Sequence, residues 1–438
     1  MKTFPLKSIL LVAMFTAALF LSGCSSIARG VTEAVIDRQG QEEDTRQCEI
    51  EGTSFGGIRE SLDRQVPNSP QITKVLMVHG ISSHLPGYSS RFQKKLYENL
   101  DLTTTEPTVK TIQLDDSDIQ WNENEPRTLG QLRVTRHADA TGMRQLLFYE
   151  LTWSDITDPQ KQALATDSAN NEGLARAGLN ASLKSFMNAT VPDLLIYNGN
   201  GYDRITSSVR ESVCWMLADS WDDLPANGRH ECEKWSRSTF STLKQDDHFF
   251  VTHSLGSRIT IDTIQNFSNL EKQTTKNSHL DEVGKTVRDK EFTVFMMANQ
   301  LPLLQMGRSA PEISAETDAY CQTNGQKSAE RVMRKMNIIA FSDPNDILSY
   351  PVPLDFTTNS IDSRICPAVT NVSLNIAAQK SLFDAASFAN PLTAHSGYME
   401  DDRVIDLIAN GISKKKITPL IEKRSKWLEQ AQIGERKK

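Results

Sequence analysis

Several features that define large protein classes are missing from this sequence. Beyond the apolar run at residues 9–21, no stretch is long and apolar enough to span a membrane. The formal net charge of −7 argues against binding to nucleic acid, whose phosphates require basic surfaces. The six cysteines include no Cys-x-x-Cys pair and no Cys/His cluster at zinc spacing, so nothing supports a metal site. We therefore expect a soluble body with no cofactor and no nucleic-acid partner.

The N-terminus has the pattern of an export signal. Two lysines precede the apolar run 9–21, which leads into Leu-Ser-Gly-Cys24. Small residues directly before a cysteine resemble a bacterial lipobox. The resemblance implies removal of a signal peptide at 1–23, lipidation of Cys24 with acyl chains such as palmitate, and membrane anchoring; a plain signal peptide or a single span is the alternative. Ser25 is similar to the residue that directs Gram-negative lipoproteins to the outer membrane, on its periplasmic side.

The other five cysteines would lie in an oxidising compartment if the chain is exported. An odd number leaves at least one of them without a partner. We expect the pairs Cys214–Cys232 and Cys321–Cys366, because each closes a loop within one insertion or between neighbouring segments. Spacing alone does not fix the connectivity.

The stretch 248–261 predicts a strand, a tight turn and a helix. Phe249–Val251 form the strand, Thr-His-Ser254-Leu-Gly the turn, and Ile259, Ile261 and Ile264 begin the helix. A serine on such a turn exposes its hydroxyl above the sheet, and the next backbone N–H points to where an oxyanion would form. Thr252 stands where the Gly-x-Ser-x-Gly pattern has its first glycine. A serine between a strand and a helix can also be a helix cap. Ser254 is therefore a candidate nucleophile.

Candidate partners for this serine follow two later strands. The strand 336–341 ends in Ser-Asp343-Pro-Asn-Asp346. Asp346 is preferred to Asp343 as an acid because apolar residues follow it, although an Asp-Pro turn with capping carboxylates has the same pattern. His395 lies after the last predicted strand, 371–376, and before a C-terminal helix. Histidine is the residue type best suited to a general base at neutral pH, although a lone loop histidine is more often a surface residue.

These pieces occur in an order that resembles a known fold. A buried strand at 74–78 leads into His-Gly-Ile81, and the serine, aspartate and histidine follow. A His-Gly loop, a Ser turn, an Asp and a His, each at a strand end, resemble the α/β-hydrolase fold of serine esterases and lipases over about residues 70–410. The resemblance implies a mostly parallel central sheet flanked by helices. It also implies a catalytic triad and an oxyanion hole, made by Ser254, Asp346 and His395 and by the N–H groups of Ile81 and Leu255.

The same resemblance implies the reaction. Ser254 would attack a carboxylic ester, form an acyl-enzyme and release the acyl group to water. An ester or lipid substrate in the membrane is favoured by the lipid anchor. Two alternatives remain open: acyl transfer to another acceptor, and a catalytically inactive hydrolase-fold lipoprotein that binds a partner in the cell envelope.

The remaining segments suggest how the chain is divided. The region 155–245 is rich in predicted helix, with one possible strand at 193–197, and is expected to be a helical cap that shapes the site or binds a partner protein. The basic tail 413–438 is expected to be a docked helix, with a membrane-facing amphipathic helix as the alternative. The full division is a signal peptide 1–23, a tether and N-terminal extension 24–70, a core 71–154 and 246–412, the cap 155–245 and the tail 413–438.

Overall fold

The computed structural model describes most of the chain after residue 46. The predicted signal peptide, Cys24 and the first part of the tether lie outside the described residues, as does the tail beyond residue 428. The described ranges are 47–65, 71–102, 108–119, 121, 127–169, 178–232, 242–273, 284–382 and 386–428.

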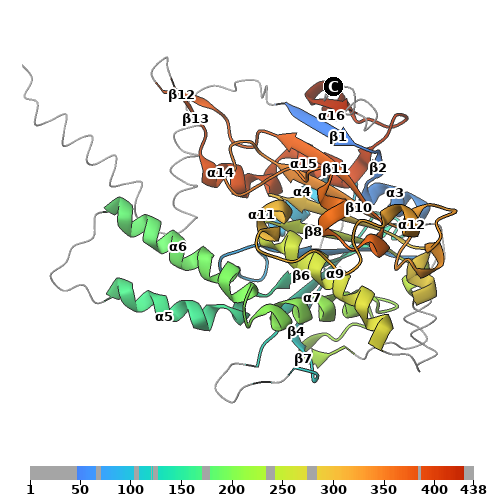
Figure 1. Ribbon diagram of the computed structural model, residues 1–438, viewed down its shortest axis with the longest axis horizontal. Helices are drawn as coiled ribbons and strands as arrows, with labels where there is room; N and C mark the ends of the chain where they lie inside the picture. The colour runs from blue at the N-terminus through green and yellow to red at the C-terminus, as the bar shows by residue number, and fades with distance from the viewer. Residues whose placement is uncertain are drawn as a thin grey trace, which may run out of the picture.

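One large sheet organises these residues (Figure 1). It has 11 strands in the order β15-β1-β11-β10-β9-β8-β3-β6-β5-β4-β7. The six neighbouring strands from β11 to β6 run parallel, and β1 and β5 run antiparallel to the ends of this block. The sheet is therefore mixed, and the predicted α/β class, a large sheet flanked by helices, is confirmed. The strands are β1 (Cys48–Gly52), β3 (Thr73–Val78), β4 (Thr108–Asp115), β5 (Gln131–Ala138), β6 (Gln145–Thr152), β7 (Asn227–Glu231), β8 (Asp247–His253), β9 (Glu291–Met297), β10 (Lys335–Ser342), β11 (Pro367–Leu374) and β15 (Ser425–Leu428).

Helices cover both faces of the sheet, because its central strands are apolar on both sides. In β3, Leu76 and Val78 pack with residues of α7 and α9, whereas Val75 and Met77 pack with residues of α4 and α15 on the opposite face. None of the helices in the described residues has the length and hydropathy of a membrane span. The main helices are α3 (Ile58–Arg64), α4 (Ser90–Asn99), α5 (Asp158–Ala169), α6 (Gly178–Tyr197), α7 (Tyr202–Met216), α9 (Leu255–Gln273), α11 (Leu301–Gln305), α12 (Thr317–Cys321), α13 (Phe356–Ser360), α14 (Pro391–Ser396), α15 (Asp402–Asn410) and α16 (Pro419–Arg424).

Helices α5 and α6 form an arm that projects from the body (Figure 1). They belong to the segment predicted as a helical cap. The possible strand at 193–197 was wrong: these residues are the last turn and a half of α6. Asp193, Ile196 and Tyr197 are buried, and their spacing of three and four residues places them on one side of a helix. A short apolar run fits a helix or a strand equally well by composition, and packing on the body decides it here.

Both predicted disulfides are present. Cys214 is bonded to Cys232 and Cys321 to Cys366, and Cys48 is a buried free cysteine. The first bond joins the end of α7 to the residue after β7. The second joins α12 to the residue before β11 and so ties the segment 300–335 to the sheet.

The two ends of the described chain add strands that the sequence analysis did not predict. The segment expected as a tether contains β1, which pairs with β11 on one side and with β15 from the basic tail on the other. The tail thus contributes both a short helix, α16, and a strand. Two smaller sheets pair β2 (Phe55–Gly56) with β14 (Gly411–Ile412) and β12 (Lys380–Leu382) with β13 (Ala386–Phe388).

Candidate active site

Ser254 stands on a strained turn between β8 and α9. Its φ of 55° lies in the left-handed region, which residues other than glycine rarely adopt. The surroundings hold it there: its N–H donates to the carbonyl of Met297 (2.9 Å), and its carbonyl accepts from the N–H (3.0 Å) and the hydroxyl (2.7 Å) of Ser257. The backbone of Ser254 is therefore fully engaged, which leaves its side chain to face other groups.

Two glycines let the His-Gly loop, residues 79–84, pack directly against this turn. A Cβ on Gly80 would lie 2.5 Å from the Cβ of Ser254, and a Cβ on Gly256 would lie 2.3 Å from the carbonyl oxygen of Val78. Both distances are far shorter than real contacts, so neither position accepts a side chain without movement of the backbone. The end of β3 and the first turn of α9 thus meet at Ser254.

Thr252 occupies an ordinary strand position. It is buried within β8, pairs with Val78 on one side and with Met296 on the other, and its hydroxyl donates to the carbonyl of Phe295 (3.4 Å). The strained residue is Ser254, two positions later. The departure from the glycine pattern therefore has a local structural reason, because the strand has room for this side chain.

Replacing Thr252 with glycine is expected to lower the free energy of unfolding by about 2 kcal/mol, because a glycine inside a strand is entropically costly and buried contacts are lost. Chemical denaturation measures this change, with Thr252→Ser as the control that keeps the hydroxyl. The reactivity of Ser254 should not increase. A glycine variant that is more stable, or whose serine reacts tenfold faster, would show that the threonine distorts the turn.

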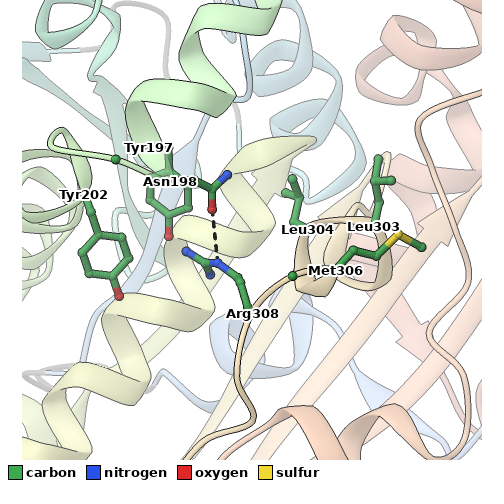
Figure 2. Close-up of a pocket in the computed structure, with 9 residues that line it drawn as sticks. Tyr197, Asn198, Tyr202, Leu303, Leu304, Met306 and Arg308 are labelled. Carbon is green, nitrogen blue, oxygen red and sulfur yellow. Dashed lines mark hydrogen bonds between the residues drawn. The ribbon is translucent and has the colours of Figure 1, made fainter.

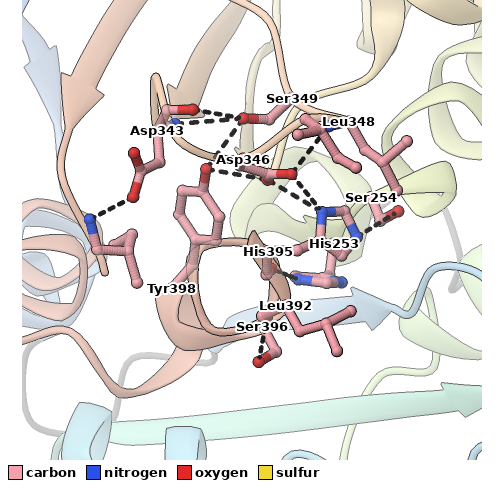
Figure 3. A network of polar contacts seen from close by, with 12 residues as sticks. His253, Ser254, Asp343, Asp346, Leu348, Ser349, Leu392, His395, Ser396 and Tyr398 are labelled. Carbon is pink, nitrogen blue, oxygen red and sulfur yellow. Dashed lines mark hydrogen bonds and ion pairs between the residues drawn. The ribbon is translucent and has the colours of Figure 1, made fainter. Parts of the chain in front are cut away.

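His395 lies beside Ser254 (Figure 3). It is carried by α14, which starts at a proline and whose first N–H groups are capped by the side chain of Asn390. The imidazole Nε2 is 3.1 Å from the hydroxyl oxygen of Ser254. The predicted loop position of His395 is wrong, because His395 lies near the end of this short helix.

Asp346 completes the cluster. Its two oxygens lie 3.0 and 2.9 Å from Nδ1 of His395. Because an ionised carboxylate only accepts hydrogen bonds, Nδ1 carries the proton and Nε2 is left to accept from Ser254. Burial alone would raise the pKa of Asp346, but the hydrogen bonds from His395 and from the N–H of Leu348 outweigh it, so this pKa lies below its ordinary value. The carboxylate therefore stays ionised.

Asp343, the alternative acid, has a different set of partners. Its side chain accepts from the N–H groups of Ile376 (2.6 Å), Ala377 (3.2 Å) and Asn345 (2.7 Å). It therefore ties the loop after β10 to the loop after β11, as Figure 3 shows for one of these bonds. The structure brings Asp346, and not Asp343, to His395.

Two further histidines support the site without joining the cluster. Nε2 of His253 donates to the carbonyl of His395 (2.8 Å), and Nε2 of His79 accepts from the N–H of Trp153 (3.0 Å). Burial, with neighbouring His395, lowers the pKa of His253 to about 3, and burial lowers the pKa of His79 well below its ordinary value. Both rings are therefore neutral, and each fixes a loop that borders Ser254. In the sequence both histidines were visible only as neighbours of the His-Gly loop and of the serine turn.

The two predicted oxyanion donors flank Ser254. Leu255 is the first residue of α9, and N–H groups in the first turn of a helix have no acceptor within the helix. Ile81 follows Gly80, which packs on the Ser254 side chain. Both residues therefore lie next to Ser254, one in the chain and one through the contact of Gly80.

A separate pocket of about 500 Å³ lies between the end of α6, the start of α7 and α11 (Figure 2). Arg308 is held there by Asp262 (2.6 Å) and by the side-chain oxygen of Asn198 (3.2 Å), and the hydroxyl of Tyr197 donates to the same Asp262 (2.5 Å). These bonds tie α6 and the segment after α11 to α9. The lining residues were not selected from the sequence, and they include no member of the Ser254 cluster.

The comparisons with known proteins assign no family to the chain, so a function has to be inferred from the geometry of the site. Within the described ranges, no group of three or more His, Cys, Asp or Glu residues is arranged to hold a metal ion. The chain was compared with protein-family models, with curated proteins and with solved structures, and none of them matches it.

Proposed function

We propose that the protein is a serine hydrolase of the α/β-hydrolase fold that cleaves a carboxylic ester. The observation that carries this proposal is the continuous chain of contacts from Ser254 through both nitrogens of His395 to Asp346, at 3.1 Å and 2.9 Å. The three residues come from the ends of β8 and β10 and from the segment after β11, up to 141 positions apart. The order of contacts, serine to histidine to aspartate, is that of a nucleophile, a base and an acid that orients the base.

The sheet supports the same proposal. The serine follows the strand β8, which lies between β3 with its His-Gly loop and β9, while the acid and the histidine follow strands farther along the parallel block. Ligands of open α/β sheets bind beyond the carboxyl ends of such strands. The strained Ser254 and the close approach of Gly80 are the features that a nucleophile turn requires.

The proposed reaction follows from the contacts. Ser254 Oγ attacks the ester carbonyl while its proton passes to Nε2 of His395, and Asp346 stabilises the imidazolium. The N–H groups of Ile81 and Leu255 hold the oxyanion of the tetrahedral intermediate. Collapse breaks the ester bond, and the leaving alkoxide takes the proton from His395. Water then attacks the acyl-enzyme by the same steps and regenerates the serine; an acceptor other than water would make the protein an acyltransferase.

We also propose that the protein works in the bacterial cell envelope, anchored through Cys24, and in a Gram-negative organism on the periplasmic side of the outer membrane. The two disulfides, Cys214–Cys232 and Cys321–Cys366, support export, because such bonds persist in oxidising compartments. A membrane location favours ester substrates that are themselves in the membrane.

A second candidate function is binding of an envelope partner through the arm. Its support is the exposure of four large apolar side chains on α5 and α6: Leu164, Phe186, Met187 and Leu195. Exposed apolar surface on a projecting part of a protein is a candidate interaction site, and these side chains lie on the two helices of one arm. This function needs no activated serine, so the reactivity of Ser254 separates the two candidates.

A fluorophosphonate probe is expected to label wild-type protein at Ser254 and to leave Ser254→Ala unlabelled. Only a serine whose proton can pass to a base reacts readily with this reagent. Mass spectrometry of the labelled peptide identifies the residue, and circular dichroism shows that the variant is folded. If folded wild-type protein reacts neither with this probe nor with a smaller sulfonyl fluoride, the hydrolase proposal fails and the binding function is favoured.

A further inference from the structure

The arm reaches the His-Gly loop through one buried carboxylate. Asp193, on α6, accepts a hydrogen bond of 2.6 Å from the backbone N–H of Ser82. The side chain of Asp193 is 0% exposed. Ser82 has a φ of 81°, a strained conformation that needs support from neighbouring groups. An element more than a hundred residues away along the chain thus holds this loop in its conformation.

A lysine forms an ion pair with the buried carboxylate of Asp193. Nζ of Lys161, on α5, lies 3.0 Å from Asp193 and 2.9 Å from Asp158, and its side chain is itself almost fully buried. A buried carboxylate without a partner would be strongly destabilising, and Lys161 supplies that partner. Asp158 in turn accepts from the hydroxyl of Ser83 (2.6 Å). Both helices of the arm therefore hold adjacent residues of the loop.

Proline marks the point where the arm leaves the body. Pro192 lies inside α6, directly before Asp193, and a proline within a helix removes one backbone hydrogen bond. After it the helix is packed on the body at Ile196 and Tyr197, whereas Phe186 and Met187 before it are exposed. Asp193 is thus in the part of α6 that is fixed relative to the sheet.

We propose that Asp193 is a positioning residue for the oxyanion hole, an inference that rests on the proposed function. Its carboxylate fixes the peptide group between Ile81 and Ser82, and so limits the rotation that would turn the N–H of Ile81 away from the oxyanion. Hydrogen bonds to a carboxylate are about twice as strong as those between neutral groups, which suits a strained peptide. Asp193 does not touch the reacting atoms, and it acts through the loop.

The test compares three variants of the full chain. Asp193→Ala removes the acceptor, and we expect it to slow fluorophosphonate labelling of Ser254 by about a hundredfold, the order seen when one oxyanion donor is lost. Asp193→Asn keeps the shape of the side chain and a neutral acceptor. Its labelling rate should lie between those of wild type and Asp193→Ala. Asp246→Asn is the matched control: it removes a buried carboxylate from Lys74 (2.6 Å) at the opposite end of β8 from Ser254 and leaves the bond to Ser82, so its rate should stay within about threefold of wild type.

A second measurement separates positioning from a structural role. A boronic acid forms a tetrahedral adduct with Ser254 Oγ whose boron-bound oxygen occupies the oxyanion hole, while the serine proton passes to His395. With a p-nitrophenyl ester as substrate, Asp193→Ala should lower kcat and phenylboronic acid affinity by a similar factor and leave KM nearly unchanged. Asp193→Asn supplies the same comparison if the alanine variant does not fold.

The outcomes distinguish this inference from the proposed function. Wild-type labelling with both Asp193 variants within threefold of wild type overturns the positioning role alone. Absence of labelling in folded wild-type protein overturns the hydrolase function, and the positioning role with it. If Asp193→Ala lowers kcat, raises KM and lowers the melting temperature together, the loss of activity reflects general destabilisation. That result also overturns the inference.

Discussion

Replacing His395 with alanine is expected to lower kcat for ester hydrolysis by about a millionfold, because nucleophile and base act as one unit. In the proposed function the imidazole, 3.1 Å from Ser254 Oγ, is the base, and without it the serine proton has no protein acceptor in this position. Hydrolysis of a p-nitrophenyl ester, followed by absorbance, measures the loss. A buried serine without a base should also lose its fluorophosphonate labelling.

His230 provides the control for this substitution. It lies on β7, the edge strand at the far end of the sheet from β11, and His230→Ala should leave kcat unchanged. The double variant Ser254→Ala/His395→Ala should be no slower than either single variant, because removing one member already disables the unit. A His395→Ala protein that keeps more than about a hundredth of the wild-type rate would exclude a role for His395 as the base.

The central strands could be predicted because their signal is local. The runs at 74–78, 249–251 and 336–341 are apolar enough to be buried on both faces, and each became a strand of the parallel block. The residues that follow such strands meet at one edge of the sheet. The order of the His-Gly loop, the serine, the acid and the histidine therefore predicted that these residues meet, and the structure brings Ser254, His395 and Asp346 into contact.

The outer strands could not be predicted in this way. β7 has the sequence Asn-Gly-Arg-His-Glu and no apolar alternation, and it is a strand only because it pairs with β4. β1 and β15 complete one edge of the sheet from segments far apart in the sequence. Their pairing is a property of the tertiary structure, which local propensity does not encode.

The residues that support the site were even harder to predict from the sequence than the outer strands. His253 was visible beside the serine, but its bond to the carbonyl of His395 joins residues 142 positions apart. Asp193 was part of a run that fits either a helix or a strand, and its contact with Ser82 spans 111 positions. Motifs name the reacting groups because chemistry limits their residue types. The groups that hold a loop can be any donor or acceptor, and only the fold shows which one is used.

Asp346 and Asp343 offer the sharpest remaining test, because the two residues are three positions apart and have different partners. Asp346→Asn is expected to lower kcat by about ten-thousandfold, because an amide no longer holds His395 with the proton on Nδ1. Its effect on folding should be small, since Asn fits the same space. The rate with a p-nitrophenyl ester and the melting temperature are measured for both variants.

Asp343→Asn should show the opposite pattern. Its carboxylate accepts from the N–H groups of Ile376 and Ala377, and an amide in its place weakens these bonds and costs about 1–3 kcal/mol of stability. The melting temperature should fall, while kcat of the folded fraction stays within about tenfold of wild type, because Asp346 and His395 keep their contact. If Asp343→Asn abolished the reaction and Asp346→Asn left it intact, the acid would be the other aspartate. The contacts at 2.9 and 3.0 Å between Asp346 and His395 would then describe a different state from the active one.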